Sequence, residues 1–176
     1  AVGHDITSRP GSIGSVSAAL PQFGVTSFLP TVVTSPPRQR SEAIGALDSV
    51  RSGTDGSSPG ADPIGLHFEG PMISRSHLGA HTASHVAALE VDEIESWIAS
   101  GAVALVTLAP EVPGAIDAIR QLSDGGVVVS GGHTAMTPVD LARARRAGLR
   151  YATHLFNAMA AFNHRAPGPI GAVLGD

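Results

Sequence analysis

Residues 65–74 read GLHFEGPMIS, and this stretch indicates the kind of sheet that the chain forms. A short apolar run that ends at turn residues is typical of a buried strand, and here the run from Pro63 ends at Gly70-Pro71. Glu69 therefore places a carboxylate at the end of a buried strand. Because a buried charge is costly unless it is paired or bound to a metal, Glu69 requires a cation. That cation is either a basic side chain such as Arg75 or a metal ion.

The rest of the chain alternates between strand-like and helix-like segments. We expect strands at residues 25–33, 64–69, 103–109, 127–130 and 151–155, and helices at 41–51, 91–100, 113–122 and 137–147. Strands that alternate with helices form a parallel sheet with helices outside it. The sequence therefore predicts an α/β fold: a partial (β/α)8 barrel of the TIM type, with about five parallel strands, as a single domain over residues 1–176. An open, doubly wound sheet is the alternative at this point.

Composition excludes several classes of protein. The 176 residues contain no cysteine, which excludes disulfides and thiolate metal sites. A net charge of −4 argues against nucleic acid as a partner, and no apolar run approaches the length of a membrane span. All eleven basic residues are arginine, so a phosphate clamp would have to use Arg, His or backbone N–H groups. We expect a cytoplasmic protein that acts on a small molecule.

Three potential metal ligands fall at the ends of expected strands. Glu69 ends one strand, His133 follows another and His154 lies near the end of the next. In a parallel barrel these ends share one face, where barrel enzymes hold their active sites. A single histidine there is more commonly a satisfied polar residue, but a carboxylate with two imidazoles suits a divalent metal. We expect Zn²⁺, with Fe, Mn or Co as alternatives, and His67 should point away from Leu66 and Phe68 in a supporting role.

The order of several motifs resembles a known family. The motifs are TSFLPTVVTS, GLHFEGPMIS with GAH after it, LVTLAPE, VVVSGGHTAM, and ATHLFNAM with PGPIGA after it. Together they resemble the N-acetylglucosamine-6-phosphate deacetylase family of the amidohydrolase superfamily, over nearly all of the chain. The resemblance implies hydrolysis of the acetamide of N-acetylglucosamine 6-phosphate to glucosamine 6-phosphate and acetate.

The resemblance also assigns roles to individual residues. Glu69, His133 and His154 match the metal ligands of the family. Residues matching substrate contacts are Ala80, His81, Asn157, Ala158 and Arg165. Arg165 matches a phosphate-binding arginine that can reach into a neighbouring subunit, which implies a homodimer. His81 could stabilise the developing oxyanion, while the metal would activate water and polarise the amide carbonyl.

The resemblance implies that part of the family's machinery lies outside this sequence. The catalytic Asp of the family is expected beyond Asp176, and its first-strand ligands before Ala1. We therefore expect a central fragment that lacks its N- and C-terminal parts and is inactive alone. One alternative is a non-catalytic fragment that binds metal or sugar phosphate. Another is a different amidohydrolase, although those usually carry a carboxylated lysine at the metal and this chain has no lysine.

Overall fold

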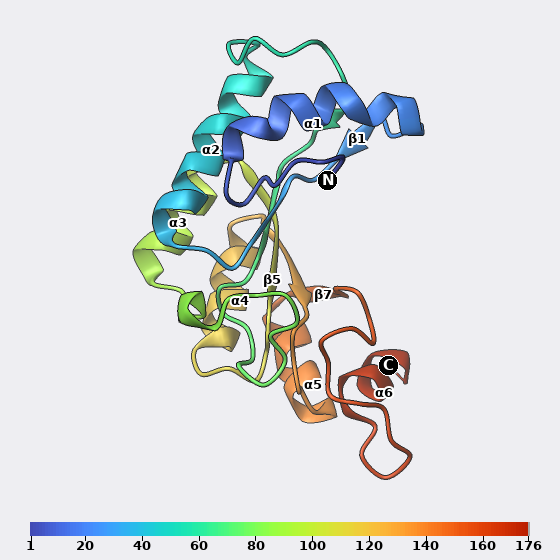
Figure 1. Ribbon diagram of the computed structural model, residues 1–176. Coiled ribbons are helices and arrows are strands. Elements are labelled where there is room, and N and C mark those ends of the chain that lie inside the picture. Colours follow the sequence, from blue (N-terminus) through green and yellow to red (C-terminus); the bar gives the residue numbers. More distant parts are fainter. Residues whose placement is uncertain (176) are drawn as a thin grey trace.

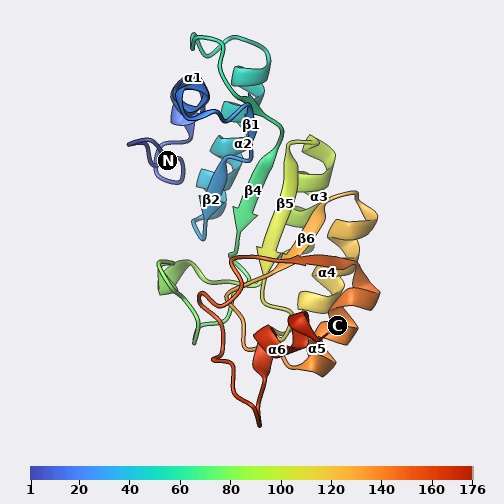
Figure 2. The same ribbon diagram turned by 90° about the vertical axis from the view of Figure 1, so that its right-hand side faces the viewer.

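A five-stranded parallel sheet organises the computed structural model, which describes residues 1–175. The sheet order is β2-β4-β5-β6-β7, and Figure 2 shows β2, β4, β5 and β6 side by side. The order follows the sequence without the reversal that marks a doubly wound sheet, so that alternative is excluded and the parallel α/β prediction is confirmed. The strands are β2 (Thr31–Val33), β4 (Leu66–Glu69), β5 (Val103–Leu108), β6 (Val128–Gly131) and β7 (Leu149–Ala152).

Helices follow the strands and pack on one face of the sheet. Helices α2, α3, α4 and α5 contact β4, β5, β6 and β7 respectively, and α2, α3 and α4 lie along the left of the sheet in Figure 1. Side chains alternate between the two faces along β4, and Phe68 lies on the face that the helices cover. It points toward α3, and its ring lies 4.7 Å from that of Trp97. The bounds of these helices are α2 (Pro37–Arg51), α3 (Val91–Ser100), α4 (Ala115–Asp124) and α5 (Pro138–Ala147).

The opposite face of the sheet carries a row of hydrogen-bonded polar side chains. The His67 ring lies 3.1 Å from the Thr31 hydroxyl through Nδ1 and 2.7 Å from the Thr107 hydroxyl through Nε2. The Thr153 hydroxyl lies 2.7 Å from those of Thr107 and Ser130. Burial lowers the pKa of His67, so the ring is a neutral member of this row. Since Glu69 follows His67 by two residues on the same strand, its side chain emerges on this polar face.

All five expected strands differ in bounds from those in the structure, and two differ in ways that matter for the fold and the site. The expected strand 25–33 is interrupted at Leu29-Pro30, giving β1 (Ser27–Phe28) and β2, since proline has no N–H for a sheet ladder. Strand β1 pairs with β3 (Asp62–Pro63) in a separate two-stranded parallel sheet. The expected strand 151–155 is β7, which begins and ends earlier, so His154 lies in the segment after the strand.

Helices at both ends of the chain were not expected from the sequence. They are the 3₁₀ helix Pro10–Ser12, α1 (Ile13–Ala19), the 3₁₀ helix Leu20–Phe23 and α6 (Gly168–Leu174), and a further 3₁₀ turn covers Ala83–His85. Each of α1 and α6 has only seven residues, which is too short to show a strong apolar period. Among the described residues, no helix has the length and apolar character that crossing a membrane requires.

Candidate metal centre

Glu69 lies at the centre of a cluster of histidines at the carboxyl end of the sheet. It ends β4, and the chain turns away at Gly70, whose φ is +87°. A Cβ at position 70 would lie 2.1 Å from the Thr34 hydroxyl oxygen, so only glycine fits this turn. The Glu69 side chain is 12% exposed, which leaves its carboxylate largely shielded from water. This carboxylate therefore needs a cation, as its place in the sequence predicts.

His133 reaches Glu69 from the loop after β6. Its Nε2 lies 2.8 Å from Glu69 Oε1, and its Nδ1 donates to the His77 carbonyl oxygen at 2.9 Å. Because a carbonyl oxygen only accepts, the proton of the neutral ring lies on Nδ1, which leaves a lone pair on Nε2. The adjacent Gly132 is needed because a Cβ there would lie 2.7 Å from a methyl carbon of Thr107. The left-handed turn itself is made by His133, with φ of +49°.

His154 approaches the same carboxylate oxygen from the segment after β7. Its Nε2 lies 2.8 Å from Glu69 Oε1 and 3.1 Å from His133 Nε2. Its side chain is one-third exposed, whereas that of His133 is 4% exposed, so the cluster opens toward solvent on the His154 side. The structure thus brings together the residues that the sequence assigned to a metal: Glu69, His133 and His154. Their role as ligands stays a prediction.

The contact between Glu69 and His133 requires a positive charge. The lone pair on His133 Nε2 faces a carboxylate oxygen that also carries lone pairs, so the two atoms repel unless a proton or a metal ion lies between them. Burial raises the pKa of Glu69, but the contacts with His133, His81 and His154 outweigh it and hold the pKa well below its ordinary value. Burial lowers the pKa of His133, but its hydrogen bond to Glu69 outweighs that effect and raises the pKa. One oxygen and two imidazole nitrogens aimed at one point fit a divalent metal in place of the proton.

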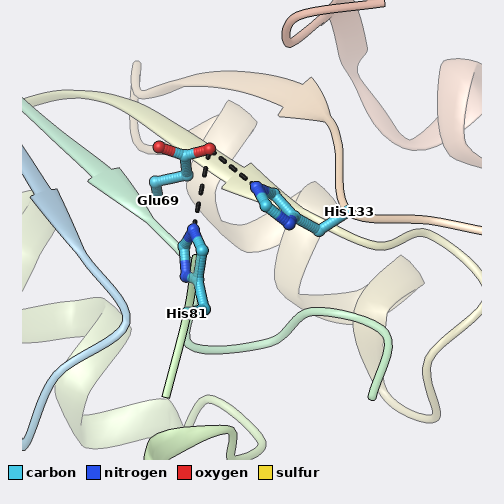
Figure 3. Close-up of side chains that lie close together, drawn as sticks. All are labelled: Glu69, His81 and His133. Carbon is cyan, nitrogen blue, oxygen red and sulfur yellow. Dashed lines mark hydrogen bonds and ion pairs between the residues drawn. The ribbon is translucent and has the colours of Figure 1, made fainter. Parts of the chain in front are cut away.

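His81 is the third histidine near Glu69, and distance alone would also make it a ligand. Ligand atoms of Glu69, His81 and His133 all lie within 4.8 Å of one another, and Figure 3 shows the two rings approaching the carboxylate. However, the Thr34 amide donates to His81 Nδ1 at 3.3 Å, and the Thr34 hydroxyl lies 2.7 Å from the same nitrogen. A backbone N–H can only donate, so Nδ1 accepts and Nε2 carries the proton, 3.8 Å from Glu69 Oε1. We therefore interpret His81 as a hydrogen-bond donor at the edge of the centre.

The remaining predicted site residues lie in the loop before His81 and in the segment after His154. A Cβ at Gly79 would lie 3.4 Å from the Cβ of Ala158 and 3.2 Å from a ring carbon of His133, so the loop before His81 borders the segment after His154. The predicted substrate residues Ala80, Asn157 and Arg165 are exposed, and Ala158 is half-buried. Their contact with a substrate stays a prediction.

Arg75 donates to the carbonyl oxygens of Ala83 and Val86, so the suggested pair with Glu69 was wrong.

Two supporting contacts near the cluster were not predicted from the sequence. The backbone carbonyl of His77 orients His133, a contact that no side-chain pattern can reveal. Glu111, in the motif LVTLAPE, contacts the loop that carries His133, and its position in a quoted motif was the available signal.

In the metal-free protein, the pair formed by Glu69 and His133 should contribute to the free energy of unfolding, and this contribution should depend on pH. The raised pKa of His133 gives stability that is complete below its ordinary value of 6.5 and is lost as pH rises through the folded-state pKa. The lowered pKa of Glu69 gives stability that is present above 4.5 and is lost as pH falls. The difference in unfolding free energy between the wild type and His133→Asn should therefore be largest between about pH 4.5 and 6.5. Urea unfolding of both proteins with a chelator present measures it, and a difference that does not change with pH would contradict the pairing.

Comparison with known proteins identifies a family likeness. No family model matches the chain. The chain is 39% identical over 173 residues to N-acetylglucosamine-6-phosphate deacetylase of Danio rerio, and the match covers 94% of this chain and 41% of that protein. The structure resembles that of N-acetylglucosamine-6-phosphate deacetylase from Pasteurella multocida, with a TM-score of 0.83 and 28% identity over 99% of this chain and 45% of that one.

A second solved structure carries a bound sugar phosphate. It is a substituted form of the Mycobacterium smegmatis enzyme in complex with N-acetyl-D-glucosamine-6-phosphate, with a TM-score of 0.76 and 34% identity over 97% of this chain and 42% of that one. The resemblance that the motifs predicted is confirmed. The chain spans about two-fifths of the length of the curated relatives that it matches.

Proposed function

We propose, from the premise that this chain shares its sequence and fold with a segment of the N-acetylglucosamine-6-phosphate deacetylases, that the protein is a metal-dependent hydrolase. Its substrate would be N-acetylglucosamine 6-phosphate, and its products glucosamine 6-phosphate and acetate. The observation that carries the proposal is the convergence of His133 Nε2 and His154 Nε2 on Glu69 Oε1, each at 2.8 Å. These atoms lie at the carboxyl end of a parallel sheet, which is where barrel enzymes place their chemistry.

The proposed ligands are Glu69, His133 and His154. An oxygen and two imidazole nitrogens favour Zn²⁺, and Fe, Mn or Co would also accept this set. When bound, the metal supplies a water of lowered pKa and a Lewis acid for the amide carbonyl. The protein's own part is to hold both imidazoles with their lone pairs toward one point, and the His77 carbonyl does this for His133.

His81 would bind the amide oxygen of the substrate. Its tautomer, set by the Thr34 amide, leaves Nε2–H free to donate toward the space beside Glu69. The ring is buried and its centroid lies 4.2 Å from that of His133, so its position is fixed before substrate binds. A fixed donor aimed at a developing negative charge lowers the barrier without reorganisation at the moment of reaction.

The sugar phosphate would lie over the segment after β7. We propose that Ala80, Asn157 and Ala158 contact the sugar, and that Arg165 binds the phosphate. Arg165 is exposed, and its backbone N–H donates to the Asn163 side chain at 2.9 Å, which shapes the loop that presents the guanidinium. A guanidinium matches phosphate oxygens through paired hydrogen bonds. We further propose a cytoplasmic homodimer in which Arg165 reaches the neighbouring site.

Arg165→Ala should raise the KM for N-acetylglucosamine 6-phosphate by about 10- to 100-fold, which is 1.4 to 2.8 kcal/mol of lost binding. The KM for unphosphorylated N-acetylglucosamine should change little, because that sugar has no phosphate to bind. Steady-state kinetics with both sugars measures the two values. Arg146→Ala, which removes an exposed arginine from the last turn of α5, is the matched control. Equal effects of Arg165→Ala on both sugars would show that Arg165 does not bind the phosphate.

An assay of acetate release tests the proposed function. The intact protein, loaded with Zn²⁺, should release acetate and a free amine from N-acetylglucosamine 6-phosphate. The second candidate is a protein that binds metal and sugar phosphate without turnover. Binding of both ligands by calorimetry without acetate release would support that candidate and contradict hydrolysis.

A further inference from the structure

The carboxylate of Glu111 joins the loop after β5 to the loop after β6. Its Oε2 accepts the hydroxyl proton of Thr134 at 2.5 Å, and its Oε1 accepts the Ala135 backbone N–H at 2.6 Å. Thr134 and Ala135 directly follow His133, the proposed metal ligand. A single carboxylate therefore fixes both residues that come after the ligand.

Thr134 extends this connection to the segment after β7. Its N–H donates to the Ala158 carbonyl at 3.2 Å, and its own carbonyl accepts the Ala160 N–H at 3.1 Å, as in a short parallel ladder. Its hydroxyl also accepts the Met136 N–H at 2.9 Å. The side chain is completely buried, so water cannot replace any of these partners. Thr134 is thus the point at which three loops at one end of the sheet are joined, and Figure 2 shows that end below the strands.

The segments joined in this way hold strained backbone. Outside glycine, positive φ angles occur at His133, His154, Phe156 and Ala158, at +49°, +32°, +82° and +49° respectively, and at Val2. Such conformations persist only where their surroundings hold them, and they concentrate at functional sites. The hydrogen bonds of Glu111 and Thr134 adjoin two of these positions, His133 and Ala158, and a bond from the Ser74 N–H to the His133 carbonyl also holds the first.

We propose that Glu111 and Thr134 are a pair of positioning residues for the metal centre and the sugar-binding segment. The pair touches neither metal nor substrate. It fixes the backbone of His133 against the loop after β5, and it sets the distance between that ligand and Ala158. The proposal rests on the proposed function, because it assigns the pair to His133 as a metal ligand.

Four single variants test the pair. Glu111→Ala removes both acceptor oxygens, and Thr134→Val keeps the shape of the side chain but removes the hydroxyl. The conservative partners are Glu111→Gln, whose amide oxygen accepts the Ala135 N–H while its NH₂ donates to Thr134, and Thr134→Ser, which keeps the hydroxyl. The intact protein is used throughout, with Zn²⁺ affinity measured by competition with a chelating dye and amide hydrogen exchange measured without metal.

Glu111→Ala and Thr134→Val should each weaken Zn²⁺ binding by about 10- to 100-fold. The amides of Ala135 and Ala160 should exchange at least about tenfold faster, while amides within β4 and β5 keep their protection. The conservative variants should stay within about threefold of the wild type. The double variant should be little worse than either single one, since the two residues act through one contact.

Three results would overturn the proposal. Unchanged affinity and exchange in Glu111→Ala would show that the contact is not needed. An equal loss in Glu111→Gln would assign the effect to charge rather than to bracing. Faster exchange throughout the sheet would show a general loss of stability. If the wild type binds no Zn²⁺, the proposed metal centre fails, and the exchange measurement still decides whether Glu111 and Thr134 fix the loops.

Discussion

Glu69→Gln should abolish tight metal binding, with a loss of Zn²⁺ affinity of at least about 1,000-fold, or roughly 4 kcal/mol. Gln has the same shape, so β4 and its polar face should remain as they are. The change replaces an anion by a neutral amide at the point where two imidazole lone pairs converge. The metal would then lose its only charged ligand among the three, and acetate release would fall to background.

Metal analysis after dialysis against dilute chelator provides the measurement. The matched control is Glu42→Gln, which removes a partly exposed carboxylate that pairs with Arg38 on α2. That variant should retain zinc and activity, because exposed ion pairs contribute little. Unchanged zinc stoichiometry in Glu69→Gln would refute the assignment of Glu69.

His81→Asn should lower kcat by about 100- to 1,000-fold and leave the zinc content unchanged. The Asn oxygen can still accept from the Thr34 amide, which His81 Nδ1 does now. What the variant lacks is the Nε2–H donor that we assign to the substrate oxygen. Since the metal would keep Glu69, His133 and His154, the expected loss is in turnover alone.

His154→Ala is the second variant, and it distinguishes the role of His154 from that of His81. His154 is partly exposed, so truncation costs little packing, and the expected loss is zinc itself. Kinetics and metal analysis on the two variants together distinguish a donor from a ligand. Loss of zinc from His81→Asn with retention in His154→Ala would reverse the two assignments.

The part of this site that can be predicted from the sequence is the part that lies at the ends of strands. The apolar run before Glu69 and the break at Gly70-Pro71 place the carboxylate correctly, because the alternation of the strand decides which side it faces. Two glycines precede His133 in the sequence, and glycine would favour a sharp turn at those positions. In the structure the left-handed residue is His133 itself, and Gly132 is required by the close approach of Thr107.

Other parts depend on contacts that sequence spacing does not encode. The expected strand 25–33 is divided at Pro30, and β1 pairs with β3, which is distant from it in the sequence. The tautomers of His81 and His133 are set by the backbone of Thr34 and His77, groups that every residue carries. Such contacts emerge only once the sheet has brought distant loops together.

The central claim is that Glu69, His133 and His154 share one divalent cation. Anomalous diffraction from crystals of the zinc-loaded protein, recorded at the zinc absorption edge, tests it most directly. We expect one peak about 2.0–2.2 Å from a Glu69 oxygen and from Nε2 of His133 and His154, with His81 Nε2 outside bonding distance. A peak bonded to His81 in place of His154, or no peak within reach of Glu69, would contradict the account.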